Sequence, residues 1–161
     1  MRAAIRAATP ADTRAIFALT YELAEFEQLT HVFTATEDGL HDALFGARPS
    51  IEALVAEDQG SLVGYAMFFH NYSSFVGKRG LYLEDVYVQP SQRGGGLGTA
   101  LLARLAAIAV ERQCGRFEWT VLDWNRPAIG FYEKMGATIL PDWRVVRLTG
   151  DALNQLAATS G

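Results

Sequence analysis

VQPSQRGGGLGT, residues Val88–Thr99, is the stretch that decides the fold. It joins an apolar segment that ends at Val88 to an amphipathic segment, Gly96–Arg112, whose leucines recur at helical spacing. Four of the five residues from 94 to 98 are glycine, which lets the backbone turn tightly and lets a ligand approach closely. A helix that begins here points free N–H groups and its positive dipole end into the turn. The stretch therefore predicts a strand, a phosphate-binding turn and a helix in succession.

The glycine turn does not fit the two common nucleotide signatures. A P-loop requires lysine followed by serine or threonine after its last glycine, and no lysine follows this run. The dinucleotide pattern G-x-G-x-x-G fails because its last place is Thr99 or Leu101. From the residues alone, a plain glycine-rich turn stays open beside a phosphate site.

The segments on either side of the turn alternate between strand and helix patterns. Gln59-Gly60 predicts a hairpin turn between two apolar runs, and Thr9-Pro10 and Thr36 predict helix starts. Strands are expected at 2–7, 51–56, 62–69, 81–88, 117–122 and 143–148, and helices from Thr9, from Thr36, over 96–112 and over 127–135. This order predicts an α/β fold in which helices flank a mixed sheet.

Length and composition limit the classes of protein that fit. The chain has 161 residues, of which 50% are hydrophobic and 20% charged, and no repeat or linker interrupts it, so one domain over 1–161 is expected. A net charge of −4 disfavours binding to nucleic acid. No apolar run is long enough to cross a membrane and no signal-peptide core begins the chain, so a soluble cytoplasmic protein is expected.

The sequence offers neither a metal site nor a cysteine nucleophile. Cys114 is the single cysteine, which excludes an intrachain disulfide, and no histidine is evident as its partner. His31, His41 and His70 stand in unlike contexts without ligand spacing. No metal cofactor is therefore predicted.

Arg93-Gly94-Gly95-Gly96-Leu97-Gly98 resembles the R-x-x-G-x-G/A signature of the GNAT superfamily of N-acetyltransferases. The resemblance implies the GNAT fold, with a mixed, mostly antiparallel sheet, and acetyl-CoA as cosubstrate. It also implies that the turn holds the pyrophosphate and that the preceding strand binds the pantetheine arm through its backbone. The implied contacts are Arg93, Gly94, Gly95, Gly96, Leu97, Gly98 and Thr99 for the pyrophosphate, and Val86, Tyr87 and Val88 for pantetheine.

A second motif, Asn125–Gly136, resembles the N-x-x-A-x-x-F-Y-x-x-x-G motif of the same superfamily. Without the resemblance, Asn125 is interpreted as a helix cap and Tyr132 as a packing residue. With it, Asn125, Pro127, Ala128 and Tyr132 contact coenzyme A, and Tyr132 donates a proton to the leaving thiolate. Capping and coenzyme contact are compatible for Asn125.

Three further segments, Ala24–Glu27, Phe45-Gly46 and Leu81–Val88, resemble the spermidine/spermine acetyltransferase branch, which includes relatives that act on thialysine. The resemblance implies an acceptor site at Phe26, Glu27 and Glu84, with Asp85 on the opposite strand face unless a bulge intervenes. Phe26 replaces the usual tyrosine, which leaves the acceptor undecided. Trp119 faces the substrate in the branch, and a purely packing role stays equally open.

These features predict transfer of acetyl from acetyl-CoA to a primary amine of a small cationic molecule, a polyamine, diamine or thialysine-like compound. Because an ammonium of pKa about 10.4 cannot attack, Glu84 is expected to take its proton. The backbone of Val86 would bind the oxyanion and Tyr132 would protonate the thiolate. The alternatives are a protein amino-terminal or lysine acetyltransferase and a non-catalytic coenzyme-A-binding module.

The resemblance also implies a homodimer. In this branch the carboxy-terminal strand meets the partner subunit, and Val145, Val146 and Leu148 would serve here. An ordinary strand within one chain explains the same residues, so both interpretations stand.

Overall fold

The computed structural model describes residues 3–161 and divides into two compact units, residues 1–120 and 121–161. Arg2, the first residue of the expected amino-terminal strand, lies outside the described residues. The two units are described one at a time, and a single domain over 1–161 stays a prediction.

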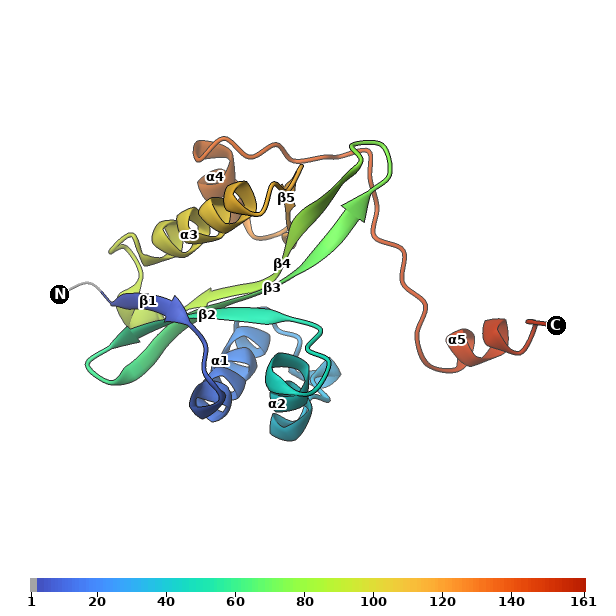
Figure 1. Ribbon diagram of the computed structural model, residues 1–161, viewed down its shortest axis with the longest axis horizontal. Coiled ribbons are helices and arrows are strands. Elements are labelled where there is room, and N and C mark those ends of the chain that lie inside the picture. Colours follow the sequence, from blue (N-terminus) through green and yellow to red (C-terminus); the bar gives the residue numbers. More distant parts are fainter. Residues whose placement is uncertain (1–2) are drawn as a thin grey trace. The chain divides into compact units, whose positions relative to one another are not determined.

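The first unit is built on a five-stranded sheet whose strands follow chain order, β1-β2-β3-β4-β5 (Figure 1). Its strands are β1 Ala4–Ala7, β2 Glu52–Asp58, β3 Ser61–Ser73, β4 Lys78–Val88 and β5 Phe117–Glu118. Each neighbouring pair is antiparallel except β4 and β5, which are parallel. The prediction of an α/β fold with a mixed, mostly antiparallel sheet is confirmed.

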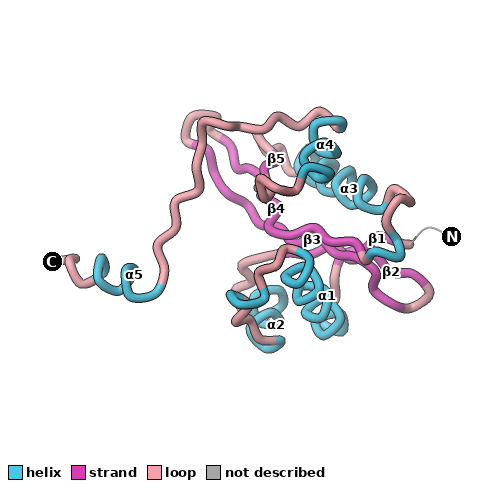
Figure 2. The backbone as a smooth tube through the Cα atoms, turned by 180° about the vertical axis from the view of Figure 1, so that it is seen from behind, coloured by secondary structure: helices cyan, strands magenta, loops and turns pink. Residues whose placement is uncertain are grey.

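Helices cover both faces of this sheet. Figures 1 and 2 show α1 Thr13–Phe26 and α2 Glu37–Phe45 on one face and α3 Leu97–Glu111 on the other. The core beneath α1 and α2 combines helix and strand residues that are at most 7% exposed. Its buried members are Ile16, Leu19, Leu44, Ala53, Val55, Tyr65, Met67 and Tyr87. The α1 face of the sheet is therefore apolar, and any polar group on it stands out.

Local signals in the sequence act as predicted at two points. The Thr36 hydroxyl accepts a hydrogen bond from Gly39 N at 3.1 Å and caps α2. Gln59 and Gly60 both have positive φ, 50° and 83°, and join β2 to β3 in a two-residue hairpin turn. The short 3₁₀ turns η2 Thr30–Val32 and η3 Pro90–Gln92 complete the connections of this unit.

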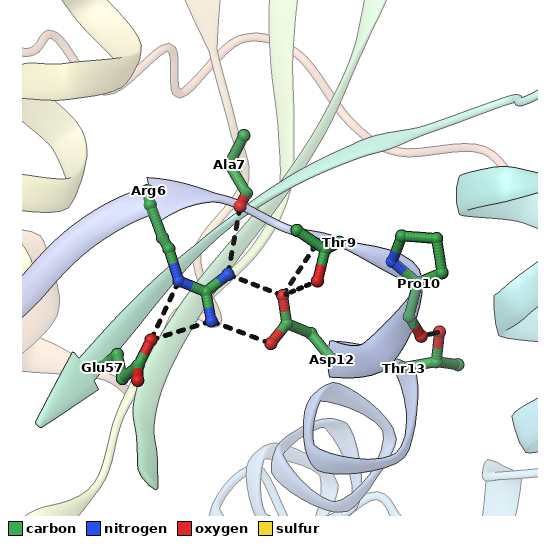
Figure 3. Close-up of polar contacts among 7 residues, drawn as sticks. All are labelled: Arg6, Ala7, Thr9, Pro10, Asp12, Thr13 and Glu57. Atoms are coloured by element: carbon green, nitrogen blue, oxygen red, sulfur yellow. Dashed lines mark hydrogen bonds and ion pairs between the residues drawn. The ribbon is translucent and has the colours of Figure 1, made fainter. Parts of the chain in front are cut away.

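A network around Asp12 ties the amino-terminal strand to α1. Pro10 opens the 3₁₀ turn η1 Pro10–Asp12, and the Asp12 carboxylate accepts from Thr9 N at 2.7 Å, so the cap works through Asp12. Arg6 donates to both oxygens of Asp12 and to Glu57, as Figure 3 shows. The Arg6 guanidinium beside it lowers the pKa of Asp12 to about 2.

The second unit contains α4 Arg126–Lys134 and α5 Gly150–Ala157. The strand predicted at 143–148 is wrong: these residues lie outside the sheet, and Val145 and Val146 are 71% and 93% exposed. Strand propensity without a neighbouring edge leaves the backbone groups unpaired, so the segment stays irregular. The strand predicted at 117–122 is shortened to β5, which forms only two pairs with β4.

We predict that Asp12→Asn lowers the free energy of unfolding by about 1–2 kcal/mol at pH 7. The folded-state pKa of Asp12 lies below its ordinary value, so the stabilisation is present above pH 4 and is lost as pH falls toward 2. Urea unfolding across pH 2–7 checks this, with the exposed Asp142→Asn as control. An equally steep loss of stability below pH 4 in the Asp12 variant would contradict it.

Candidate active site

A β-bulge in β4 shapes the centre of the site. Met67 of β3 pairs with Asp85, but the next residue, Phe68, pairs with Leu83, so Glu84 is an extra residue without a partner. A regular strand would place Leu83 and Asp85 on the same face, and the extra residue places them on opposite faces. From the sequence, Asp85 is expected on the opposite strand face from Glu84 unless a bulge intervenes, and the structure contains that bulge.

The bulge turns Asp85 toward α1. Asp85 stands opposite Met67, which belongs to the buried cluster under α1 and α2. Leu83 stands opposite Phe68, whose ring lies 5.9 Å from the guanidinium carbon of Arg112 at the end of α3. Of the two predicted acids, Asp85 is thus half-buried beneath α1, whereas the Glu84 side chain is exposed.

A buried phenol that was not predicted holds Asp85. Tyr65 is fully buried in β3, and its hydroxyl donates to Oδ2 of Asp85 at 3.0 Å. Burial raises the pKa of Asp85 to about 6, although the hydrogen bond from Tyr65 opposes the shift. Burial also raises the pKa of Glu27, and both Glu27 and Glu84 raise that of Asp85 by repulsion. Glu27 and Glu84 therefore lie near enough to Asp85 to repel its charge, and the three acids form one acidic site.

The end of α1 sets the position of Phe26 and Glu27. Gln28 adopts a left-handed φ of 60°, and two backbone bonds close the helix, Gln28 N to Glu25 O at 3.1 Å and Leu29 N to Ala24 O at 2.9 Å. This pair of bonds is a Schellman motif. It fixes Glu27, which is half-buried, at the helix end.

Arg93 links the glycine turn to this acidic region. Its Nε donates to the carbonyl of Val88 at 2.9 Å, and its guanidinium carbon lies 4.9 Å from the Phe26 ring and 5.6 Å from the Tyr87 ring. Tyr87 in turn donates to Glu22 of α1 at 3.4 Å. The predicted donor-site residue Arg93 and the predicted acceptor-site residue Phe26 are therefore in direct contact.

The glycine turn has the backbone geometry expected of an anion-binding turn. Gly94 and Gly96 have φ of 84° and 82°, a region that other residues rarely adopt. The first backbone hydrogen bond of α3 runs from Ala100 N to Gly96 O. The amides of Leu97, Gly98 and Thr99 therefore have no acceptor within the helix. A Cβ added at Gly94 would meet nothing within 4 Å. The turn is thus open and rich in unpaired N–H groups.

The edge of β4 beside the turn is open over the predicted pantetheine contacts. β5 pairs with β4 only at Leu81 and Tyr82, and within residues 3–161 no strand lies beside Leu83–Val88 on that side. An extended ligand can add to such an edge through main-chain hydrogen bonds. Val86, Tyr87 and Val88 all lie on this stretch.

The second predicted motif belongs to the other unit. Asn125 Oδ1 accepts from Ala128 N at 3.4 Å and caps α4, which Pro127 and Ala128 help to begin. Tyr132 lies within α4, half-buried, with its ring 5.6 Å from that of Phe131. The capping role of Asn125 is confirmed, and the coenzyme contacts of this motif stay predictions.

Cys114 does have a histidine neighbour, which the sequence did not reveal. Its Sγ lies 3.8 Å from Nδ1 of His70. Arg112 can only donate, so its 2.9 Å contact makes Nε2 of His70 the acceptor and leaves the proton on Nδ1, which donates to Gly80 O at 2.9 Å. Both ring nitrogens are occupied, so His70 cannot take the thiol proton.

Trp119 follows β5, half-buried, with its ring 4.8 Å from that of Phe117. This contact is compatible with both the packing and the substrate-facing interpretation. Among the described residues, no three His, Cys, Asp or Glu side chains gather as metal ligands. None of the helices described is both long and apolar enough to cross a membrane.

Comparison with known proteins bears on this arrangement. A model of the acetyltransferase (GNAT) family matches residues 14–137. Thialysine N-epsilon-acetyltransferase of Mus musculus is 40% identical over 164 residues, which cover 95% of this chain and 96% of that protein. L-ornithine N5-acetyltransferase NATA1 of Arabidopsis thaliana is 36% identical over 197 residues, covering 94% and 86%. An integron cassette protein from the mobile metagenome of V. cholerae has a similar structure, with a TM-score of 0.82, 25% identity and 98% of each chain covered.

We predict that Gly94→Ala destabilises the protein by about 1–2 kcal/mol, because alanine at a left-handed φ is strained. Gly95→Ala is the matched control: its φ is not positive, and the added Cβ would lie an ordinary 3.7 Å from Gln92 O. The control should change stability by less than about 0.5 kcal/mol. Urea unfolding of both variants measures the difference, and equal stabilities would show that the turn does not require the left-handed conformation.

Proposed function

Since this chain belongs to the acetyltransferase (GNAT) family, we propose that it transfers acetyl from acetyl-CoA to a primary amine of a small cationic molecule. The acceptor class is a polyamine, a diamine or a thialysine-like compound. The observation that carries the proposal is the acidic site under α1, where Asp85 and Glu27 are both half-buried, Glu84 is exposed, and Glu27 and Glu84 repel the charge of Asp85. Carboxylates in such a place attract an ammonium group and disfavour a neutral or anionic acceptor.

The donor half of the proposal rests on the glycine turn and the β4 edge. The amides of Leu97, Gly98 and Thr99 can hold a pyrophosphate at the start of α3. The open edge from Leu83 to Val88 can bind a pantetheine arm by strand addition. Both features lie in the same unit and follow each other along the chain, as a long, flexible coenzyme requires.

The acceptor half rests on charge. Glu22, Glu27, Glu84 and Asp85 surround the end of α1 and the bulge, and Arg93 is the cation that contacts this region. Thialysine and ornithine, for which two of the relatives are named, each carry an ammonium group on a short chain. That shared chemistry supports a compact cationic amine over a protein chain, which would need a groove.

In the proposed reaction a carboxylate first takes a proton from the bound ammonium. The free amine then attacks the thioester carbonyl, with the backbone N–H of Val86 as donor to the oxyanion. Collapse of the adduct breaks the carbon–sulfur bond, and the Tyr132 hydroxyl gives its proton to the leaving thiolate. The nitrogen then loses its second proton, which passes through water to the Tyr132 phenolate and restores the hydroxyl. The amide forms, and no acyl-enzyme occurs because His70 cannot activate Cys114.

The geometry supports Asp85 over Glu84 as the proton acceptor. A base works best when its pKa lies near the working pH, and that of Asp85 is raised to about 6. The Glu84 side chain, to which the sequence assigned this proton, is exposed at the bulge. Glu84 is then left to attract the cation at the rim.

Homodimer formation through residues 143–148 and a cytoplasmic location complete the proposal. Val145 and Val146 are exposed in the single chain, which supports a role in contacts with a second copy. The alternatives, acetylation of a protein and coenzyme A binding without turnover, are separated from the proposal by the acceptor assay.

We predict acetyl-CoA-dependent release of free thiol with short diamines, thialysine or spermidine, and little release with a lysine-containing peptide. Asp85→Asn should lower kcat/KM for the amine about 100-fold, as loss of a general base does. Glu84→Gln should chiefly raise KM. If none of the amines causes thiol release although acetyl-CoA binds tightly, the binding module is favoured. If the peptide causes more release than the small amines, protein acetylation is favoured.

We predict that Tyr132→Phe lowers kcat roughly 100-fold while acetyl-CoA binding, measured by calorimetry, stays unchanged. The phenyl ring keeps the packing against Phe131, and the substitution removes the hydroxyl that would donate the proton. Phe131→Leu tests the packing contribution alone. Unchanged turnover in Tyr132→Phe would remove this residue from the mechanism.

A further inference from the structure

Tyr65 is a polar group in an otherwise apolar core. It is 0% exposed and belongs to the cluster under α1 and α2, whose other members are apolar apart from Tyr87. Its hydroxyl makes one hydrogen bond, to Oδ2 of Asp85 at 3.0 Å. A buried hydroxyl is costly unless it is paired, so the bond to Asp85 accounts for the presence of a tyrosine here.

The same bond distinguishes the two oxygens of Asp85. Oδ2 is occupied by Tyr65, and within residues 3–161 Asp85 makes no other side-chain hydrogen bond. No buried side-chain oxygen of the described residues lacks a partner, so Oδ1 is at least partly accessible to solvent. One oxygen is thus anchored in the core while the other is accessible.

We propose that Tyr65 is a positioning residue for acetyl transfer: its hydroxyl anchors Asp85 and keeps this carboxylate ionised, so that Oδ1 is presented to the acceptor amine. The inference deepens the proposed function and rests on it. A hydrogen bond to the charged form favours that form, whereas burial and neighbouring negative charge oppose it. Tyr65 therefore offsets part of the cost of an ionised Asp85 and keeps it available as a proton acceptor at neutral pH.

The groups that face Asp85 all raise its pKa except Tyr65, which lowers it. Glu84, on the same strand, and Glu27, at the end of α1, both raise the pKa of Asp85. Burial acts the same way and is the largest cause. Among the described residues, Tyr65 on β3 is the group that lowers it. Burial first and Asp85 second raise the pKa of Tyr65, so the phenol stays protonated and remains a donor.

The test is the pH profile of kcat/KM for the amine in Tyr65→Phe. Loss of the hydrogen bond raises the pKa of Asp85, so the acid limb of the profile should move about one pH unit higher. At pH 6 activity should fall several-fold, and well above both pKa values the variant should approach the wild type. Tyr82→Phe is the matched control, because Tyr82 lies in the same sheet against Phe69, 5.1 Å between ring centroids. Its acid limb should not move.

A double variant separates positioning from a general loss of structure. In Asp85→Asn the acid limb assigned to Asp85 is absent, so adding Tyr65→Phe should shift nothing further. If Tyr65→Phe does not fold, 3-fluorotyrosine placed at position 65 strengthens the donor and should move the limb to lower pH. An acid limb that stays in place in a folded Tyr65→Phe protein would overturn the proposal.

Carboxyl NMR keeps this inference apart from the proposed function. The ¹³C shift of Asp85 titrates whether or not an amine is acetylated, and its midpoint should rise in Tyr65→Phe. If no amine reacts but the midpoint rises, the anchoring of Asp85 stands and the proposed acceptor class fails. An unmoved midpoint shows that Tyr65 does not govern the ionisation of Asp85, whatever the enzyme acetylates.

Discussion

The extra residue in β4 is the constraint on which the site depends. Because Glu84 has no partner on β3, the strand changes face between Leu83 and Asp85, and a carboxylate enters the apolar surface beneath α1. The same strand has an open edge beyond Tyr82, where β5 stops pairing. The bulge thus supplies an acid on one face of β4, and the end of β5 leaves a main-chain edge beside it for an extended ligand.

The energetics of this acid explain why a cation is the fitting ligand. Burial makes ionised Asp85 and Glu27 unfavourable, as their raised pKa values show. The hydrogen bond from Tyr65 offsets only part of that cost for Asp85. A bound ammonium would supply the missing positive charge, so part of the binding energy would come from relieving repulsion between the carboxylates. A neutral acceptor of the same shape would gain nothing from this source.

The sequence was sufficient for several features whose signal is local. The Gln59-Gly60 turn, the Thr36 cap and the glycine turn before α3 each depend on a few adjacent residues, and each was predicted. The bulge was not predicted, because the residue types along Leu81–Val88 are compatible with a strand that contains an extra residue and with one that does not. Tyr65 was missed because its partner lies 20 residues away, and only the register of β3 on β4 brings them together.

In the carboxy-terminal part, a strand was predicted that does not form and a helix that does form was missed. Val145 and Val146 have strand propensity, but they pair with no strand of the described residues, and propensity alone does not form a strand. The helix α5 was overlooked although Thr149 precedes it, Asp151 lies in its first turn, and Leu153 and Leu156 stand three residues apart.

The most direct test of the account is a crystal structure of the protein with coenzyme A and a short alkyl diamine. The account predicts the pantetheine arm along Leu83–Val88 and an amine nitrogen within hydrogen-bond distance of Oδ1 of Asp85, with Oδ2 still bound to Tyr65. A diamine seated away from the β4 bulge, or a pantetheine arm that leaves the β4 edge unpaired, would contradict it.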